Sequence, residues 1–248
     1  MDQRPSLLNN KKSWHQQQAE ILETLELALQ HLQSKQALPE QENGINRELF
    51  FSLKEIYFTQ RDDADQFPVR MECNNQPDSD DQVKVRSEDK RPDFKWGYVD
   101  TLERNPQKKA KDFDIECKRL GKPPRSDHIL NKEYATKGIS RFITVEHKYG
   151  KSVPAGVMIG YIQSMELPHI LTEVNTNASS NGIAQLTLTA QGWQPRGISK
   201  LEHQLSRLFP ISPFTLHHFW VDLRQSPPSL QSTTPSNSTE IEKTTPES

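Results

Sequence analysis

The chain has 248 residues, of which 33% are hydrophobic and 26% are charged, and its formal net charge at pH 7 is −2. With a mean hydropathy of −0.82, this composition predicts one globular domain with a modest core. The longest apolar run, Ala155 to Ile162, is too short to cross a bilayer, and residues 1–5 begin no apolar signal segment, so we expect a cytoplasmic protein with no membrane partner.

Two helices are predicted in the first quarter of the chain. The first begins after Ser13, has Gln16 at the capping-box position and ends before Pro39, so that residues 1–39 form a helical extension. An apolar stripe predicts the second helix from Asn46 to Thr59, after the break at Asn43-Gly44. The polar segment that follows, residues 74–89, is typical of a mobile loop.

The middle of the chain alternates between strand and helix patterns. Strands are predicted at Phe94 to Val99, Phe113 to Leu120 and Gly156 to Ile162. The last of these is apolar on both faces, as expected of a buried central strand. A helix from Asn131 to Phe142 separates the last two strands, and this order predicts a crossover within a mixed α/β sheet.

Four more elements complete a main domain at residues 40–224. We expect a helix at Leu167 to Asn175, a strand at Ile183 to Ala190, a helix at Lys200 to Phe209 and a strand at Phe214 to Leu223. Residues 225–248 are rich in Ser, Thr and Pro, which predicts a disordered tail.

One predicted strand carries charged residues at four successive positions of the same face. The period of two places them together: Asp112, Asp114, Glu116 and Lys118. Charged groups are almost never fully buried unless they are paired or bind a metal, so this face predicts either an open edge in water or a cation site. Carboxylates such as Asp93 and Glu116 suit Mg²⁺, and a nearby lysine such as Lys118 can orient an attacking water.

Pro92-Asp93, followed after 22 residues by Glu116-Cys117-Lys118, resembles the motif of the PD-(D/E)xK nuclease superfamily. The resemblance implies a restriction-endonuclease-like fold with an αβββαβ core. It also implies that Asp93 and Glu116 bind Mg²⁺ or Mn²⁺, that Lys118 positions water, and that Glu48 and Asp114 assist at the metal. The stretch from Tyr134 to Phe142, with Gly160-Tyr161, also resembles uncharacterised bacterial proteins found near phage-defence genes.

The acid-x-Lys pattern occurs elsewhere in the chain, at residues 88–90, 93–95 and 146–148. Only the match at Glu116 lies on a convincing alternating strand with a Pro-Asp upstream and a crossover downstream. The competing interpretation of this match is an exposed strand face with ordinary ion pairs.

Basic residues gather after the motif, since residues 104–151 contain 13 Lys or Arg and 6 Asp or Glu. Such a block either contacts nucleic-acid phosphates or forms a solvated surface. The phosphate interpretation assigns nucleic-acid binding to Arg119, Lys122, Arg125, Lys132, Lys137 and Arg141. Lys137 and Arg141, spaced i,i+4, form the pair expected to matter most.

These observations predict a metal-dependent nuclease that acts on DNA in bacterial defence or repair, as a homodimer or with a defence-system partner protein. The alternative is a catalytically inactive adaptor that binds nucleic acid or protein and works without metal. Other classes have less support. The chain lacks a G-x-S-x-G elbow, a P-loop and a dinucleotide glycine pattern, and Cys73 and Cys117 are too far apart to suggest a disulfide or zinc. His203 with Arg207, and His217-His218, fit structural roles.

Overall fold

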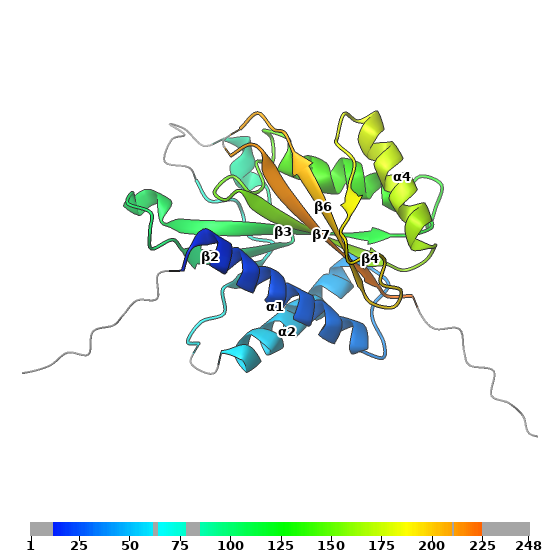
Figure 1. The fold of residues 1–248 in the computed structure, drawn as a ribbon, viewed down its shortest axis with the longest axis horizontal. Coiled ribbons are helices and arrows are strands. Elements are labelled where there is room, and N and C mark those ends of the chain that lie inside the picture. The colour runs from blue at the N-terminus through cyan, green and yellow to red at the C-terminus, as the bar shows by residue number, and fades with distance from the viewer. Residues whose placement is uncertain (1–11, 62–63, 78–84, 210, 225–248) are drawn as a thin grey trace, which may run out of the picture.

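A computed structural model describes residues 12–61, 64–77, 85–209 and 211–224. One seven-stranded mixed sheet runs through the molecule in the order β1-β2-β3-β4-β7-β6-β5 (Figure 1). The strands are β1 Val69–Met71, β2 Phe94–Val99, β3 Ala110–Leu120, β4 Ala155–Ile162, β5 Thr187–Leu188, β6 Ile198–Leu205 and β7 Phe214–Asp222. The predicted mixed α/β sheet is therefore confirmed.

The centre of the sheet is parallel and its two sides are antiparallel. Strand β4 pairs in parallel with β3 and with β7, whereas β1, β2 and β3 form an antiparallel series. Strands β5, β6 and β7 form a second antiparallel series. Every residue of β4 is buried, which confirms the central position predicted from its two apolar faces.

Helices α1 (Trp14–Ser34) and α2 (Glu42–Gln60) cover one face of the sheet (Figure 1). The predicted capping box of α1 is present: the Gln16 backbone N–H donates to Ser13 Oγ at 3.3 Å, and the Ser13 N–H donates to Gln16 Oε1 at 2.8 Å. Apolar residues of both helices, including Leu25 and Leu49, are buried with alternate residues of β3 such as Phe113 and Cys117. This core fixes one face of β3.

The opposite face of the sheet is covered by the crossover between β3 and β4 and by α4 (Leu167–Ser180). The predicted helix from Asn131 to Phe142 is a run of three short helical segments: α3 (Leu130–Glu133), the π-helical η3 (Tyr134–Gly138) and the 3₁₀-helical η4 (Ile139–Phe142). Gly138 lets this run lie close to the sheet, because an added Cβ would be 2.5 Å from Met158 Cε and 3.3 Å from Lys118 Cγ.

The predicted helix from Lys200 to Phe209 is wrong, because Ile198–Leu205 is strand β6. Leu201 and Leu205 are spaced as on a helix face, but they also fit a period of two together with buried His203, and Glu202 and Gln204 are exposed between them. Short segments of this kind fit both periods, and pairing with β7 decides the outcome.

Several predicted boundaries also shift. Strand β3 begins at Ala110 and helix α2 at Glu42, three and four residues earlier than the pattern indicates. Asn43-Gly44, predicted as a break before the helix, lies in the first turn of α2. An added Cβ at Gly44 would be 2.5 Å from Pro39 Cβ. The predicted strand at Ile183 to Ala190 is reduced to β5.

The predicted tail at 225–248 lies outside the described residues, and so does part of the predicted loop at 74–89. Within the described part of that loop, Arg86–Asp89 forms the 3₁₀ helix η1. Within the described ranges, no helix has both the length and the apolar character needed to cross a membrane.

Candidate carboxylate site

The pairing of β2 with β3 brings Asp93 beside Glu116. Phe94 lies opposite Ile115 in the antiparallel register, so the residue before β2 faces the residue after Ile115. The Cys117 backbone N–H donates to Asp93 Oδ2 at 2.7 Å, which fixes the carboxyl group against β3. The two carboxylates that the motif predicts as neighbours are therefore close in space.

Lys118 extends from the same strand into the pair. Its Nζ lies 2.9 Å from Glu116 Oε1 and 4.0 Å from Asp93 Oδ2. Nζ also donates to Glu42 Oε1 at 2.8 Å and to the Cys117 carbonyl at 2.7 Å. Burial acts to lower the pKa of Lys118, but the three carboxylates outweigh it and hold the pKa above its usual value, so the ammonium is charged.

Glu116 is completely buried, so of the two alternatives for the charged face of its strand, an open edge in water does not hold at this position. The crossover covers that face, and η4 supplies Arg141, whose guanidinium pairs with Glu116 Oε1. Within the described residues, Glu116 Oε2 has no hydrogen-bond partner. A buried carboxylate oxygen without a donor is costly, so this atom marks a position where a cation or water would be stabilising.

Asp93 has an unusual proton affinity. Burial, and next the negative charge of Glu116, raise the pKa of Asp93 to about 8. Its Oδ1 accepts a hydrogen bond from the Asn46 amide at 3.1 Å, and Asn46 in turn accepts from the Tyr161 hydroxyl at 2.8 Å. The sequence pattern does not reveal Asn46, which links α2 and β4 to Asp93.

The glutamate of α2 that contacts the site is Glu42, and the predicted Glu48 does not lie there. Glu48 lies further along α2, where it pairs with Lys35 at 2.8 Å and with Arg47 at 3.2 Å. Glu42 contacts Lys118 and also accepts from the Arg119 backbone N–H at 3.1 Å. The missed signal is the acidic first turn that favours a helix start at Glu42.

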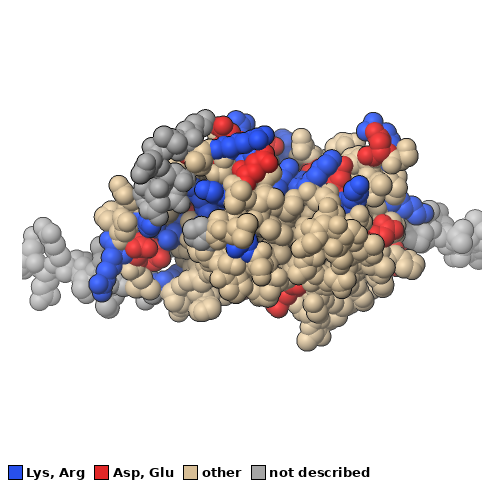
Figure 2. Space-filling view, turned by 90° about the horizontal axis from the view of Figure 1, so that it is seen from above, with Lys and Arg blue, Asp and Glu red and all other residues tan. Residues whose placement is uncertain are grey.

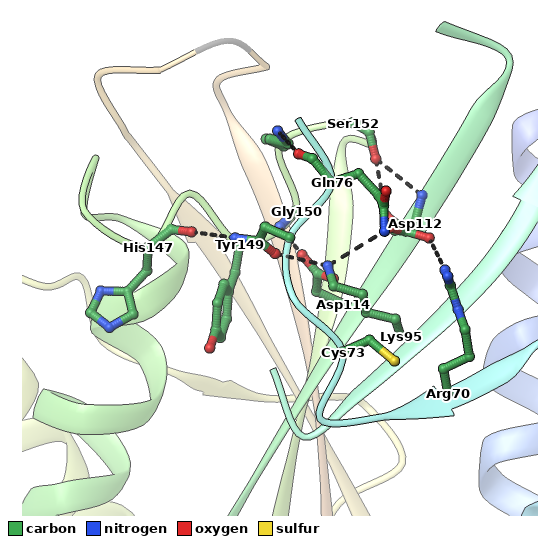
Figure 3. A network of polar contacts seen from close by, with 12 residues as sticks. Arg70, Cys73, Gln76, Lys95, Asp112, Asp114, His147, Tyr149, Gly150 and Ser152 are labelled. Atoms are coloured by element: carbon green, nitrogen blue, oxygen red, sulfur yellow. Dashed lines mark hydrogen bonds and ion pairs between the residues drawn. The ribbon is translucent and has the colours of Figure 1, made fainter. Parts of the chain in front are cut away.

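Asp114 does not join the site either, although it shares a strand face with Glu116. It pairs with the buried Lys95 at 2.7 Å and accepts from the Gly150 backbone N–H at 2.7 Å (Figure 3). Lys95 also donates to the Asn75 side chain at 2.8 Å. Asp112 lies beside this group and pairs with Arg70 at 2.7 Å. We call Lys95, Asp112, Asp114, Asn75 and Gly150 the Asp114 network.

The predicted nucleic-acid-binding residues divide into three groups. Arg141 lies in the site. Lys132, Lys137 and Arg125 are exposed, with Lys137 paired to Glu133 at 2.7 Å and Arg125 to Asp127 at 3.3 Å. Lys137 and Arg141 thus have different partners and do not act as a pair.

The third group, Arg119 and Lys122, lines a groove beside the site. On the face seen in Figure 2, basic and acidic side chains are interspersed around a broad uncharged area.

The two histidines of the sheet that are most buried form a structural cluster. His218 Nδ1 lies 2.8 Å from the Tyr134 hydroxyl, which accepts from the Trp220 indole N–H at 2.9 Å. The ring of His203 lies 5.7 Å from that of His218. Burial lowers the pKa of His203 to about 4 and that of His218 well below its usual value, so both are neutral. This fits the structural role predicted for them.

We call Asp93, Glu116, Lys118, Glu42 and Arg141 the carboxylate site. In the part of the chain that is described, no three His, Cys, Asp or Glu side chains are arranged to hold a metal. A Mg²⁺ or Mn²⁺ ion would therefore depend on Asp93 and Glu116 and keep several waters, as Mg²⁺ commonly does. The unpartnered Glu116 Oε2 fits such an ion. A comparison of the chain with protein-family models, curated proteins and solved structures found no match.

Proposed function

We propose that this protein is a Mg²⁺- or Mn²⁺-dependent nuclease with a restriction-endonuclease-like core, which hydrolyses phosphodiester bonds in DNA in bacterial defence or repair. The observation that carries the proposal is the Asp93–Glu116 pair, of which Glu116 is fully buried, with the Lys118 ammonium near both carboxylates and one Glu116 oxygen left without a donor. The order α2, β1, β2, β3, crossover helices and β4 supports it, because it matches the αβββαβ arrangement that the motif implies.

The chain's own residues would divide the work as follows. Asp93 and Glu116 would hold the ion, and Asp93 would release its carboxyl proton to do so. The bound ion would polarise a water and neutralise charge on the scissile phosphate. Lys118, fixed by three carboxylates, would orient that water. Arg141, which pairs with Glu116, would contact the phosphate.

The alternative is an adaptor with the same fold and no catalysis. One observation favours it: Lys118 and Arg141 both contact the same oxygen of Glu116, as in a purely structural ion-pair cluster. The two proposals differ in their dependence on metal, because an adaptor would bind equally well in EDTA and would cut nothing.

The test is cleavage of plasmid, linear duplex, single-stranded DNA and RNA by wild-type protein and by Glu116→Gln, in Mg²⁺, Mn²⁺ and EDTA. We expect metal-dependent cleavage of DNA by the wild type and its loss in Glu116→Gln. The matched control is Glu202→Gln, which changes an exposed glutamate of β6 and should cut normally. Mn²⁺ binding, measured by electron paramagnetic resonance, should also be lost only in Glu116→Gln. Normal cleavage by Glu116→Gln would overturn the assignment.

A further inference from the structure

A groove of about 1140 Å³ lies at the carboxyl ends of the parallel strands, next to the carboxylate site. Residues that follow β3, β4 and β7 line one side of it, and the C-terminal end of α1 with the segment up to Glu40 lines the other. In Figure 1 the end of α1 and the end of β7 lie on the same side of the molecule. Segments far apart in the sequence therefore build one surface.

The groove is basic although the chain as a whole is not. Its lining includes five cations, Lys35, Arg119, Lys122, Arg196 and Arg224, against the carboxylates of Glu40 and Asp222. Two of the cations are neutralised: Lys35 pairs with Glu48 at 2.8 Å, and Arg224 pairs with Asp222 at 2.7 Å. The other three form no ion pair with a described residue.

The three remaining cations are held in place through their backbones or by neutral groups. Arg119 donates to the Glu40 carbonyl at 3.3 Å, and the Lys122 backbone N–H donates to Ser164 Oγ at 2.9 Å. Arg196 has a φ of +57°, and its backbone N–H donates to Asp222 Oδ2 at 3.0 Å. A left-handed conformation at a non-glycine residue is disfavoured, so the fold holds Arg196 at this edge at some cost in stability.

The groove is continuous with the carboxylate site through Glu42. One oxygen of Glu42 accepts from Lys118 Nζ, and the other accepts from the Arg119 backbone N–H. Glu42 therefore connects a residue of the groove lining to the lysine of the carboxylate site. Amide and hydroxyl side chains, among them Gln36, Gln163 and Ser164, provide further donors along the groove.

No aromatic side chain of the described residues lines the groove. Proteins that bind single strands place aromatic rings against successive bases, so this lining offers backbone contacts without a stacking platform. We propose that the groove binds the sugar-phosphate backbone of a nucleic-acid duplex and delivers it to the carboxylate site. The inference rests on the proposed function for the identity of that site, but its own test requires no cleavage.

The experiment is fluorescence anisotropy with a labelled DNA duplex, an RNA duplex and the single DNA strand of the same sequence, in EDTA. We expect the wild type to bind a duplex about fivefold or more tightly than the single strand. The double variant Lys122→Ala/Arg196→Ala should bind duplex about tenfold more weakly at 100 mM salt, and its slope of log affinity against log salt should be shallower by about 2. The two duplexes decide between DNA and RNA.

A matched control removes the same two charges elsewhere. Lys54→Ala/Arg104→Ala changes an exposed lysine of α2 and an exposed arginine between β2 and β3, and it should bind as the wild type does. The variant Lys122→Arg/Arg196→Lys keeps both charges and should bind duplex as the wild type does. Thermal unfolding checks that the alanine variant is folded. Equal binding by the alanine variant and the wild type, or tighter binding of the single strand, would overturn the proposal.

Cleavage by the same variants separates this proposal from the previous one. If the groove variant cuts at high substrate concentration but with a raised KM, both proposals hold. If the wild type cuts while the groove variant matches it in binding and in KM, the groove inference fails and the nuclease stands. If duplex binding depends on the groove but nothing is cut, the nuclease proposal fails and the groove remains.

Discussion

Strand β3 holds two buried clusters of charge on one face, and they differ in how completely their polar atoms are satisfied. In the Asp114 network, both oxygens of Asp114 accept hydrogen bonds from groups within the fold, Lys95 and the Gly150 N–H (Figure 3). In the carboxylate site, two residues further along β3, Glu116 Oε2 has no partner among the described residues and Asp93 has a raised pKa. The first arrangement is typical of structure, and the second is typical of a functional site.

The largest effect that tests this comparison is on stability. Asp114→Ala removes the nearer carboxylate of the buried Lys95 ammonium, leaving only Asp112 at 3.8 Å, and it removes the acceptor of the Gly150 N–H. Breaking a buried ion pair on one side costs about 3 to 5 kcal/mol, so we expect a loss of that size in urea unfolding. The control Arg70→Ala removes a half-exposed partner of Asp112 and should cost about 1 kcal/mol or less. An Asp114→Ala variant as stable as the wild type would contradict the structural role of the Asp114 network.

A second prediction concerns the two glutamates of α2. Glu42→Gln removes a negative charge that fixes Lys118, and such supporting residues typically contribute about 10- to 100-fold in metal affinity or activity. Glu48→Gln should leave cleavage and Mn²⁺ binding unchanged, because Glu48 pairs with Lys35 instead. Steady-state cleavage rates and Mn²⁺ titrations measure both. A larger loss of cleavage and Mn²⁺ binding in Glu48→Gln than in Glu42→Gln would contradict this assignment and favour Glu48 as the site residue.

The smallest predicted effect is a dependence of stability on pH. The pKa of Asp93 in the folded state is about 8, above the ordinary value of 3.8, so the protonated carboxyl favours folding. This contribution is complete below about pH 4 and is lost as the pH rises through 8. Between pH 5 and 9 in EDTA, the free energy of unfolding of Asp93→Asn should fall by less than that of the wild type, because the variant has no carboxyl proton to lose at this position. Parallel curves for the two proteins would contradict the raised pKa.

The local pattern was sufficient to predict most of the elements that build the site. Alternation along β3, the apolar β4 and the crossover between them follow from periods of two and 3.6, and they brought Asp93, Glu116 and Lys118 together as expected. The pattern also separated Glu116 from the other acid-x-Lys matches. One of these, Asp93-Phe94-Lys95, contributes a lysine to the Asp114 network instead.

Long-range packing decided what the pattern could not. The close approach of Gly44 to Pro39 is not visible in the apolar pattern, which starts α2 at Asn46 and so leaves Glu42 outside the predicted helix. The sequence left open whether the charged face of β3 is an open edge or a cation site, and the crossover that covers this face brings Arg141 to Glu116. The groove combines residues from five separate segments, and no spacing in the sequence indicates that Arg196 lies near Lys122.

At Gly138 the crossover lies so close to the sheet that an added side chain would contact two residues of the sheet. The first atom of any side chain there would meet the methyl end of Met158, which can swing aside, but it would also press at 3.3 Å on Cγ of Lys118, the stem of the ammonium that holds the carboxylates together. Arg141 follows three residues later, so the position that fixes the approach to Lys118 lies close in sequence to the second cation of the carboxylate site. A residue that contacts no substrate thus sets the spacing of the charges around Glu116.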